Sequence, residues 1–250
     1  MLARPRIEAR ERELERLRAE RFPTLPLDCG ERVAPGVVDV EEWRDWSKRD
    51  TTPDQVRIED YLDQFDLRDR SILHVGIGNS GLARRFASRA RLICGTTIMP
   101  AEVEQAGRLG LRNYRVSAHN KYRGSDDAPD GRFDFIVDNS MTGFCCCLTH
   151  LAAMLDFYSS SLAPSGQIVT DRVGLAWAVD PQRPEWGFTF DDLAAVAPVA
   201  GLRAYRIDSN IYVLARQAPE RRPLSRRISH WVRSIARKIE RRLSRLLRAR

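Results

Sequence analysis

One stretch constrains this chain more than any other. It is a short apolar run followed by three closely spaced glycines, Ser71-Ile72-Leu73-His74-Val75-Gly76-Ile77-Gly78-Asn79-Ser80-Gly81. The apolar run predicts a buried parallel strand, and apolar residues recur at helical spacing after the last glycine. A strand that turns through glycine into a helix N-terminus lets backbone approach a ligand, and the helix N–H groups attract its polar or anionic parts. The stretch therefore predicts a nucleotide-sized site.

The G-x-G-x-x-G spacing is the one used for dinucleotides, so NAD is the first ligand to consider. A dinucleotide site needs an acidic residue about 20 residues further on, at the end of the next strand, to hold the ribose. The next predicted strand covers residues 91–97, and Thr97 occupies the place of that acid. No arginine stands beside Thr97 to receive a 2′-phosphate. The sequence therefore disfavours NAD.

The same stretch resembles the first motif of the class I S-adenosylmethionine-dependent methyltransferases, with His74 in place of the usual acid. Later segments are similar to further motifs of that family, in the family's order, at 97–106, 133–138, 162–169 and 200–202. The resemblance covers roughly residues 50–216 and implies S-adenosyl-L-methionine as the cofactor. The contacts that it implies are His74, Gly76, Gly78, Asn79, Ser80, Thr97, Ile98, His119, Asn120 and Asp138.

Strand and helix patterns alternate through the middle of the chain. We expect strands at 71–76, 91–97, 112–118, 133–138, 166–171, 202–208 and 210–216, with helices at 81–89, 100–108, 147–161 and 191–199 between them. Strands separated by helices favour a mostly parallel sheet. The short turn at Ser209-Asn210 makes the last strand antiparallel. The predicted fold is a Rossmann-like α/β sheet of seven strands, with helices on both faces.

Composition divides the chain into three parts. Residues 1–50 hold a charged helical segment with a thin stripe of Ile7, Leu14 and Leu17, which predicts a solvated helix or, less favoured, a coiled-coil partner site. Residues 51–217 form the predicted methyltransferase domain. Residues 218–250 form a basic amphipathic helix. The last 30 residues hold 12 of the 41 basic and one of the 34 acidic residues, so the preceding part is mildly acidic.

The basic tail carries a continuous apolar stripe opposite its arginines, and the stripe includes Trp231 and Ile235. That pattern predicts a helix lying in an anionic membrane interface. A nucleic-acid arm and a helix docked on its own domain or on a partner remain alternatives. No apolar run is long enough to span a bilayer, and no secretion signal is recognised, so we expect a cytoplasmic protein, peripheral at the inner face of the cell membrane.

Methyl transfer to an oxygen needs a base, and the candidates are Asp138, His150 and Asp171. Asp138 and Asp171 end neighbouring strands in the family topology, so their carboxylates are expected to lie close together. The pair could hold Mg²⁺, but a cap or loop role for each is favoured. The five cysteines, three of them at 145–147, have no zinc-type spacing, and we predict thiols and no metal site.

Aromatic residues on both sides of the predicted domain core have expected roles in binding. The tryptophans at 43 and 46 anchor the segment before the domain or cover the cofactor. Trp177, Trp186 and Phe188 are candidates to close over an acceptor. The predicted function is methyl transfer, at oxygen, to a small-molecule, glycan or lipid-linked acceptor at the membrane. The alternatives are a binding protein that lost catalysis, indicated by His74 and Thr97, and an RNA methyltransferase. The sequence predicts no oligomeric state.

Overall fold

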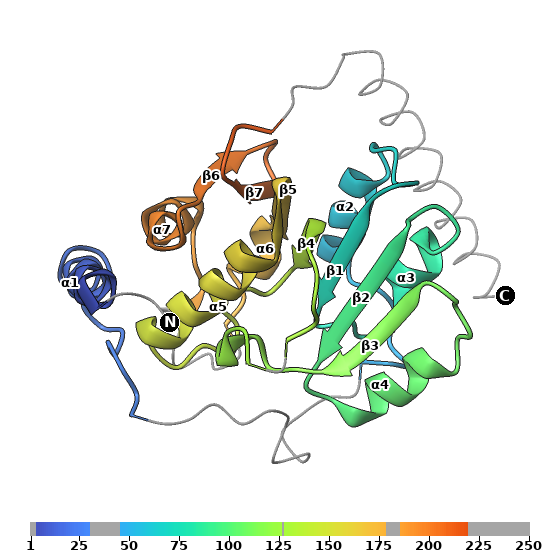
Figure 1. Cartoon of the computed structure of the whole chain (residues 1–250), viewed down its shortest axis with the longest axis horizontal. Helices are drawn as coiled ribbons and strands as arrows, with labels where there is room; N and C mark the ends of the chain where they lie inside the picture. Colours follow the sequence, from blue (N-terminus) through green and yellow to red (C-terminus); the bar gives the residue numbers. More distant parts are fainter. Residues whose placement is uncertain (1–3, 31–45, 127, 179–185, 220–250) are drawn as a thin grey trace, which may run out of the picture.

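The computed structural model describes residues 4–30, 46–126, 128–178 and 186–219. Seven strands form one sheet in the order β3-β2-β1-β4-β5-β7-β6, with helices on both faces (Figure 1). The strands are β1 (Ser71–Val75), β2 (Leu92–Thr97), β3 (Tyr114–Ala118), β4 (Phe133–Asp138), β5 (Leu162–Asp171), β6 (Arg203–Arg206) and β7 (Ile211–Ala215). This is the α/β sheet that the alternation of patterns predicts.

The first five strands pair in parallel, and β7 runs antiparallel to both β5 and β6. The prediction of an antiparallel last strand is therefore confirmed. β1 and β4 are neighbours at the centre of the sheet, and the chain leaves β1 toward β2 on one side and returns to β4 on the other. A reversal of strand order at the centre is where an open α/β sheet binds its ligand, outside the carboxyl ends of the strands.

One face of the sheet is covered by α2 (Pro53–Leu62) and α3 (Gly81–Phe86). Thr52 caps α2, accepting a hydrogen bond from the Gln55 N–H at 3.5 Å, and Pro53 begins the helix. Ile58 and Leu62 from α2 and Phe86 from α3 are fully buried against β1 and β4. This apolar layer holds the start of α3, and with it the glycine turn, against the sheet.

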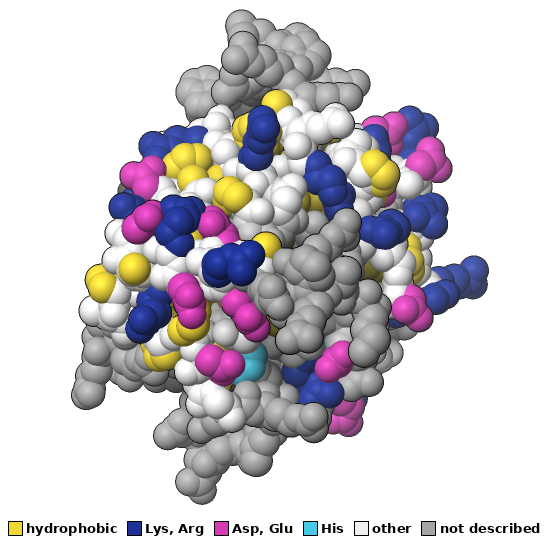
Figure 2. Space-filling view, turned by 60° about the vertical axis from the view of Figure 1, so that its left-hand side comes forward, with side chains coloured by type: hydrophobic (Ala, Val, Ile, Leu, Met, Phe, Trp, Pro, Cys, Tyr) yellow, Lys and Arg dark blue, Asp and Glu magenta, His cyan; other side chains and the backbone are white. Residues whose placement is uncertain are grey.

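The other face is covered by α5 (Leu148–Ser161) and α7 (Phe190–Val196), and α1 (Arg4–Glu20) packs on the outer side of α5. Leu14 and Leu17 of α1 are buried in the same core cluster as the apolar face of α5. The prediction of a merely solvated helix is therefore wrong for this stripe, although Arg16 pairs with Glu13 and Glu20 on the exposed side as expected. Figure 2, turned toward this side, shows basic and acidic side chains interspersed over the described surface.

The segment after β5 differs from its prediction. Trp186 and Phe188 are buried and stack on each other, and Phe188 also stacks on Phe22. They are core residues, so they do not close over an acceptor. Trp177 is 45% exposed and contacts the ring of Phe144 edge-on, so it alone of the three remains available for that role.

The remaining helical elements are short. They are α4 (Pro100–Gly107), η1 (Lys121–Arg123), α6 (Arg172–Leu175) and η3 (Ala197–Ala200). The helix predicted at 191–199 is divided between α7 and η3, where Pro198 interrupts α-helical hydrogen bonding. Among the described helices, none has the length and hydropathy needed to cross a membrane. The predicted tail helix at 218–250 and Trp43 lie outside the described residues.

Candidate functional site at the carboxyl edge of the sheet

The glycine turn after β1 has the backbone geometry that only glycine adopts freely. Gly76 has φ +72° and Gly78 has φ +49°, both in the left-handed region. Gly76 is exposed, and a Cβ placed on it would meet no heavy atom within 4 Å. The Gly76 N–H donates to the carbonyl of Thr96 at 2.8 Å, which fixes the turn to the end of β2. The turn therefore presents open backbone at the point where the sheet changes direction.

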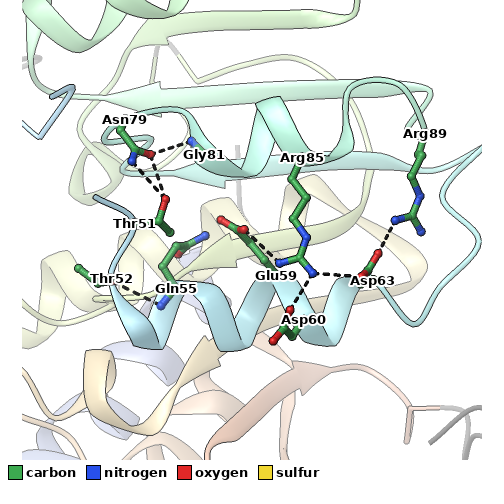
Figure 3. A network of polar contacts seen from close by, with 10 residues as sticks. All are labelled: Thr51, Thr52, Gln55, Glu59, Asp60, Asp63, Asn79, Gly81, Arg85 and Arg89. Atoms are coloured by element: carbon green, nitrogen blue, oxygen red, sulfur yellow. Dashed lines mark hydrogen bonds and ion pairs between the residues drawn. The ribbon is translucent and has the colours of Figure 1, made fainter. Parts of the chain in front are cut away.

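The segment before α2 packs against this turn. A Cβ on Gly78 would lie 3.5 Å from the Cβ of Trp46, and the Arg49 guanidinium stacks over the Trp46 ring at 5.1 Å. The Asn79 side-chain amide donates to the carbonyl of Arg49 at 2.6 Å, and its oxygen accepts the Gly81 N–H at 2.8 Å (Figure 3). Asn79 thus serves the turn and its covering segment. Trp46 lies where a cover over the glycines was expected.

The side chain of Ser80, like that of Asn79, is held within the protein. It caps α3 in the left-handed region, at φ 58°, and is completely buried. Its hydroxyl lies 3.0 Å from the hydroxyl of Tyr114, whose pKa is raised to about 12, mainly by burial. The side chains of Asn79 and Ser80 are therefore engaged within the protein, and only the glycine backbone of the predicted turn residues is open.

The end of β2 carries a carboxylate after all, supplied from α4. Thr97 donates its hydroxyl to Glu102 at 2.6 Å and accepts the Met99 N–H at 3.1 Å. Both Thr97 and Glu102 are buried. Ile98, the next residue, is half-buried. Sequence reasoning missed Glu102 because it follows Thr97 by five residues, on the first turn of a helix rather than at the strand end.

His74 lies inside β1 on the face covered by α2 and α3, because it pairs in register with Val137, which belongs to that core layer. Its Nδ1 is buried without a hydrogen-bond partner in the described part of the chain. Burial lowers the pKa of His74 to about 4, so the ring is neutral at physiological pH. A neutral ring in the sheet interior does not replace the charge of the acid that the family has there.

The loop after β3 carries His119 and Asn120. His119 is buried with its ring edge-on to Phe157 of α5, at 5.0 Å between centroids. Asn120 caps η1 by accepting the Tyr122 N–H at 3.2 Å, and it is half-buried. Asn120 therefore stays at the carboxyl edge with part of its amide available, whereas His119 is packed beneath the edge.

The two carboxylates that end β4 and β5 do not lie close together. Val137 pairs with Val169, so Asp138 and Asp171 fall on opposite faces of the sheet. Asp138 faces α5, and Asp171 faces α2. The expectation of a carboxylate pair at one cleft is therefore wrong. The reason is a register offset of one residue, since β5 continues one position further than β4 beyond the matched pair.

Each of these carboxylates has its own set of donors. Asp138 accepts from the Lys121 ammonium at 2.8 Å and from the Tyr158 hydroxyl at 2.6 Å, and the same ammonium donates to the Ser140 carbonyl at 2.7 Å. Asp138 and Lys121 thus form a buried ion pair beside the loop that joins β4 to α5.

Asp171 is completely buried and accepts two bonds of 2.7 Å from the Arg57 guanidinium. It also accepts the Val173 N–H at 2.8 Å, which caps α6. These bonds assign Asp171 to fixing α2 and α6. Sequence reasoning named both carboxylates but missed Lys121, Tyr158 and Arg57, because no spacing links them to the strands.

A network of charges joins α2 to α3 beside the turn (Figure 3). Arg85 donates to Asp60 at 2.7 Å, to Asp63 at 3.0 Å and to Glu59 at 3.3 Å. Burial raises the pKa of Glu59, and the neighbouring Arg85 opposes that rise. The network holds α3 in place, and therefore the helix N-terminus that follows the glycines.

His150 lies beside three cysteines. It lies on the first turn of α5, and its Nδ1 faces the sulfurs of Cys146 at 2.9 Å, Cys147 at 3.2 Å and Cys29 at 3.4 Å. The structure thus gathers four potential metal ligands that the sequence analysis did not connect. Cys29 is more than a hundred residues away in the chain, so no local spacing could have shown the cluster.

Solved structures of similar architecture identify the fold. The N-methyltransferase NodS from Bradyrhizobium japonicum WM9 matches with a TM-score of 0.50 and 14% identity, over 68% of this chain and 99% of that one. The protein has the class I S-adenosylmethionine-dependent methyltransferase fold.

A second solved structure is the amino pentose methyltransferase CalS10 from Micromonospora echinaspora. It matches with a TM-score of 0.49 and 17% identity, over 65% of this chain and 89% of that one. No protein-family model matches the chain, and no curated protein matches it in sequence.

Proposed function

We propose that this protein binds S-adenosyl-L-methionine at the glycine turn and transfers its methyl group to an acceptor. The single observation that carries the proposal is the open backbone of Gly76, at the switch in strand order of a methyltransferase fold. Bound there, the cofactor would supply an activated methyl group on a sulfonium. The task left to the protein is to bind, align and exclude water.

The ends of neighbouring strands supply the remaining contacts for this proposal. The buried Glu102 carboxylate, hydrogen-bonded to Thr97 at the end of β2, is the acceptor we assign to the ribose hydroxyls. The half-buried amide of Asn120 is assigned to the adenine edge, because an amide offers both a donor and an acceptor. The segment around Trp46 covers the turn. These residues fit a nucleoside whose sugar lies over β1 and β2.

Glu102 gives the test of this assignment. A hydrogen bond to a charged carboxylate is worth roughly 1 kcal/mol more than one to a neutral amide, so Glu102→Gln should weaken binding of S-adenosylmethionine by about fivefold. Glu104→Gln is the matched control, since Glu104 is exposed on the same helix and pairs only with Arg108 in the described part of the chain. Calorimetric titration of the full chain measures both affinities. Equal affinities for the two variants would contradict the ribose assignment.

Cofactor binding and methyl labelling together distinguish an enzyme from a binding protein of the same fold. If the wild-type chain takes up neither S-adenosylmethionine nor S-adenosylhomocysteine, the proposed cofactor is wrong. If it binds both but labels no acceptor in cell extracts with isotopic methyl groups, the binding-protein alternative suggested by His74 and Thr97 replaces the enzyme. Labelling of RNA would favour the third hypothesis, an RNA methyltransferase.

We further propose that the acceptor is a small molecule, glycan or lipid-linked compound methylated at an oxygen. Of the three candidate bases, Asp138 is the one at the carboxyl edge on the side of the loop 139–147, with Lys121 and Tyr158 to hold its carboxylate in place. Asp171 is committed to Arg57. We therefore assign the removal of the acceptor's proton to Asp138, and a positioning role to Lys121.

The tail supports a location at the membrane for this chemistry. Its apolar stripe and arginines are read from the sequence alone, since residues 220–250 lie outside the described part. Replacing Trp231 and Ile235 by serine in the full chain leaves the charge unchanged and removes apolar area, so flotation with anionic vesicles should weaken. Ser229→Ala is the control. Equal flotation of the double serine variant, or tight RNA binding without vesicle binding, would overturn this location.

A further inference from the structure

Three cysteine sulfurs and one histidine nitrogen converge at the N-terminus of α5. The ligand atoms of Cys29, Cys146, Cys147 and His150 all lie within 4.8 Å of one another. The measured sulfur–sulfur separations are 3.4 Å for Cys29–Cys146 and 3.9 Å for Cys146–Cys147. The sulfur–nitrogen separations are 2.9, 3.2 and 3.4 Å.

We propose that these four residues bind one zinc ion. A tetrahedral ion with bonds of about 2.3 Å to sulfur and about 2.0 Å to nitrogen separates its ligand atoms by roughly 3.8 and 3.5 Å. The Cys146–Cys147 separation is close to the first value, and the other four separations are shorter than the ideal ones. Three thiolates and an imidazole are also the donors that zinc prefers over harder cations such as Mg²⁺.

Hydrogen bonding does not explain the arrangement as well as an ion does. The imidazole Nδ1 carries either one proton or one lone pair, so it cannot make full hydrogen bonds to three sulfurs at once. A disulfide between Cys29 and Cys146 would leave Cys147 and His150 facing it without a role. One cation at the centre of the group satisfies all four ligand atoms together.

The surroundings of the cluster fit a structural ion. Cys147 is buried and Cys146 is half-buried, so the ligand atoms are largely shielded from bulk water. Binding of Zn²⁺ by three thiols and the neutral ring then releases three protons and leaves a complex of net charge −1. The N-terminus of the 14-residue α5 lies beside that negative charge, with the His150 N–H 3.4 Å from the Cys147 sulfur.

The ion would join two parts of the chain that are far apart in sequence. Residues 26 and 27 already accept backbone hydrogen bonds from the first residues of α5, Leu148 to Pro26 at 3.0 Å and Thr149 to Leu27 at 2.9 Å. Cys29 continues this segment, and Cys146 and Cys147 end the loop that follows Asp138. A closed site of four protein ligands is the structural type of zinc site. Zinc would therefore fix the N-terminal segment to the loop 139–147, which follows Asp138.

The neighbouring Cys145 provides the matched control. It belongs to the same run of cysteines and is buried, but its sulfur contacts the carbonyl of Cys147 at 3.3 Å and is not part of the cluster. The full chain purified under reducing conditions should contain about one zinc per chain by elemental mass spectrometry. Cys145→Ser should keep that zinc, whereas Cys29→Ser, Cys146→Ser and His150→Ala should lose most of it.

If a cluster variant fails to fold, metal exchange in the wild-type protein still tests the zinc site. After removal of zinc by a chelator, the reduced chain should take up Co²⁺ and show the intense visible bands of tetrahedral cobalt thiolate, and added Zn²⁺ should abolish them. Thermal unfolding should shift to lower temperature in the zinc-free chain. Equal zinc loss in Cys145→Ser and Cys146→Ser, no zinc or cobalt uptake by reduced wild type, or iron in place of zinc would each overturn the proposal.

Discussion

Aspartates at the ends of central strands have different partners on the two faces of the sheet. Asp138 and Asp171 both end central strands, yet Asp138 meets a lysine and a tyrosine on the α5 face, and Asp171 meets an arginine on the α2 face. The α5 face also holds the cysteine cluster and the loop 139–147, whereas the α2 face holds the charge network that supports the glycine turn. The α2 face therefore supports the glycine turn, and in the proposed function the α5 face would carry the acceptor side.

The largest effect is expected from removing the carboxylate on the α5 face. Asp138→Ala leaves the Lys121 ammonium, whose side chain is only 11% exposed, without its charged partner. Loss of one member of a buried pair costs about 3–5 kcal/mol, so the free energy of unfolding should fall by that amount. Urea unfolding measures it. Glu20→Ala, which breaks an exposed pair on α1, is the control and should change stability by less than about 0.5 kcal/mol.

A second prediction concerns the effect of low pH on stability, through His74 on the α2 face. The pKa of His74 is 6.5 when unperturbed and about 4 in the fold, because the ring is buried. Between these values the unfolded chain binds a proton that the folded chain does not, so this contribution to stability is complete above pH 6.5 and falls as the pH falls toward 4. At pH 5 the loss is about 2 kcal/mol.

The measurement compares wild type with His74→Gln in urea unfolding at pH 7 and pH 5. The variant should lose less stability than wild type on acidification, because it has no ring to protonate. Parallel losses in the two proteins would show that His74 does not couple folding to pH.

An effect of similar size is expected from breaking the ion pair on the α2 face. Arg57→Met leaves Asp171 buried with only the Val173 N–H as a donor among its described partners. The Arg57 side chain is 33% exposed, so water screens part of the charge, and we expect a loss of about 2 kcal/mol in the free energy of unfolding. Adding Asp171→Asn should recover part of this loss, since the buried group is then neutral. An additive double variant would contradict the pairing.

The smallest effect distinguishes the two donors to Asp138. Tyr158→Phe removes one hydroxyl and keeps the ring, and Lys121 still compensates the carboxylate. The loss should be about 1 kcal/mol in the same unfolding experiment. Tyr205→Phe, on the edge strand β6, is the control. A loss as large as that of Asp138→Ala would mean that the tyrosine, and not the lysine, is the main partner of the carboxylate.

The sequence by itself determined the architecture. The apolar run and glycines at 71–81, the alternation of strand and helix patterns and the turn at 209–210 depend on local chemistry, and each was found where it was expected. The same local chemistry identified Gly76 and Gly78 as the turn of the site, since a positive φ favours glycine over residues with a side chain.

Only the tertiary structure decided what the side chains do. Whether Asp138 and Asp171 face each other depends on the register between β4 and β5, and an offset of one residue places them on opposite faces. Glu102 reaches Thr97 from the first turn of α4, and Cys29 reaches His150 across 121 residues of chain. Contacts of this kind arise from the packing of separate elements, and packing is not encoded in the spacing of residues along any one of them.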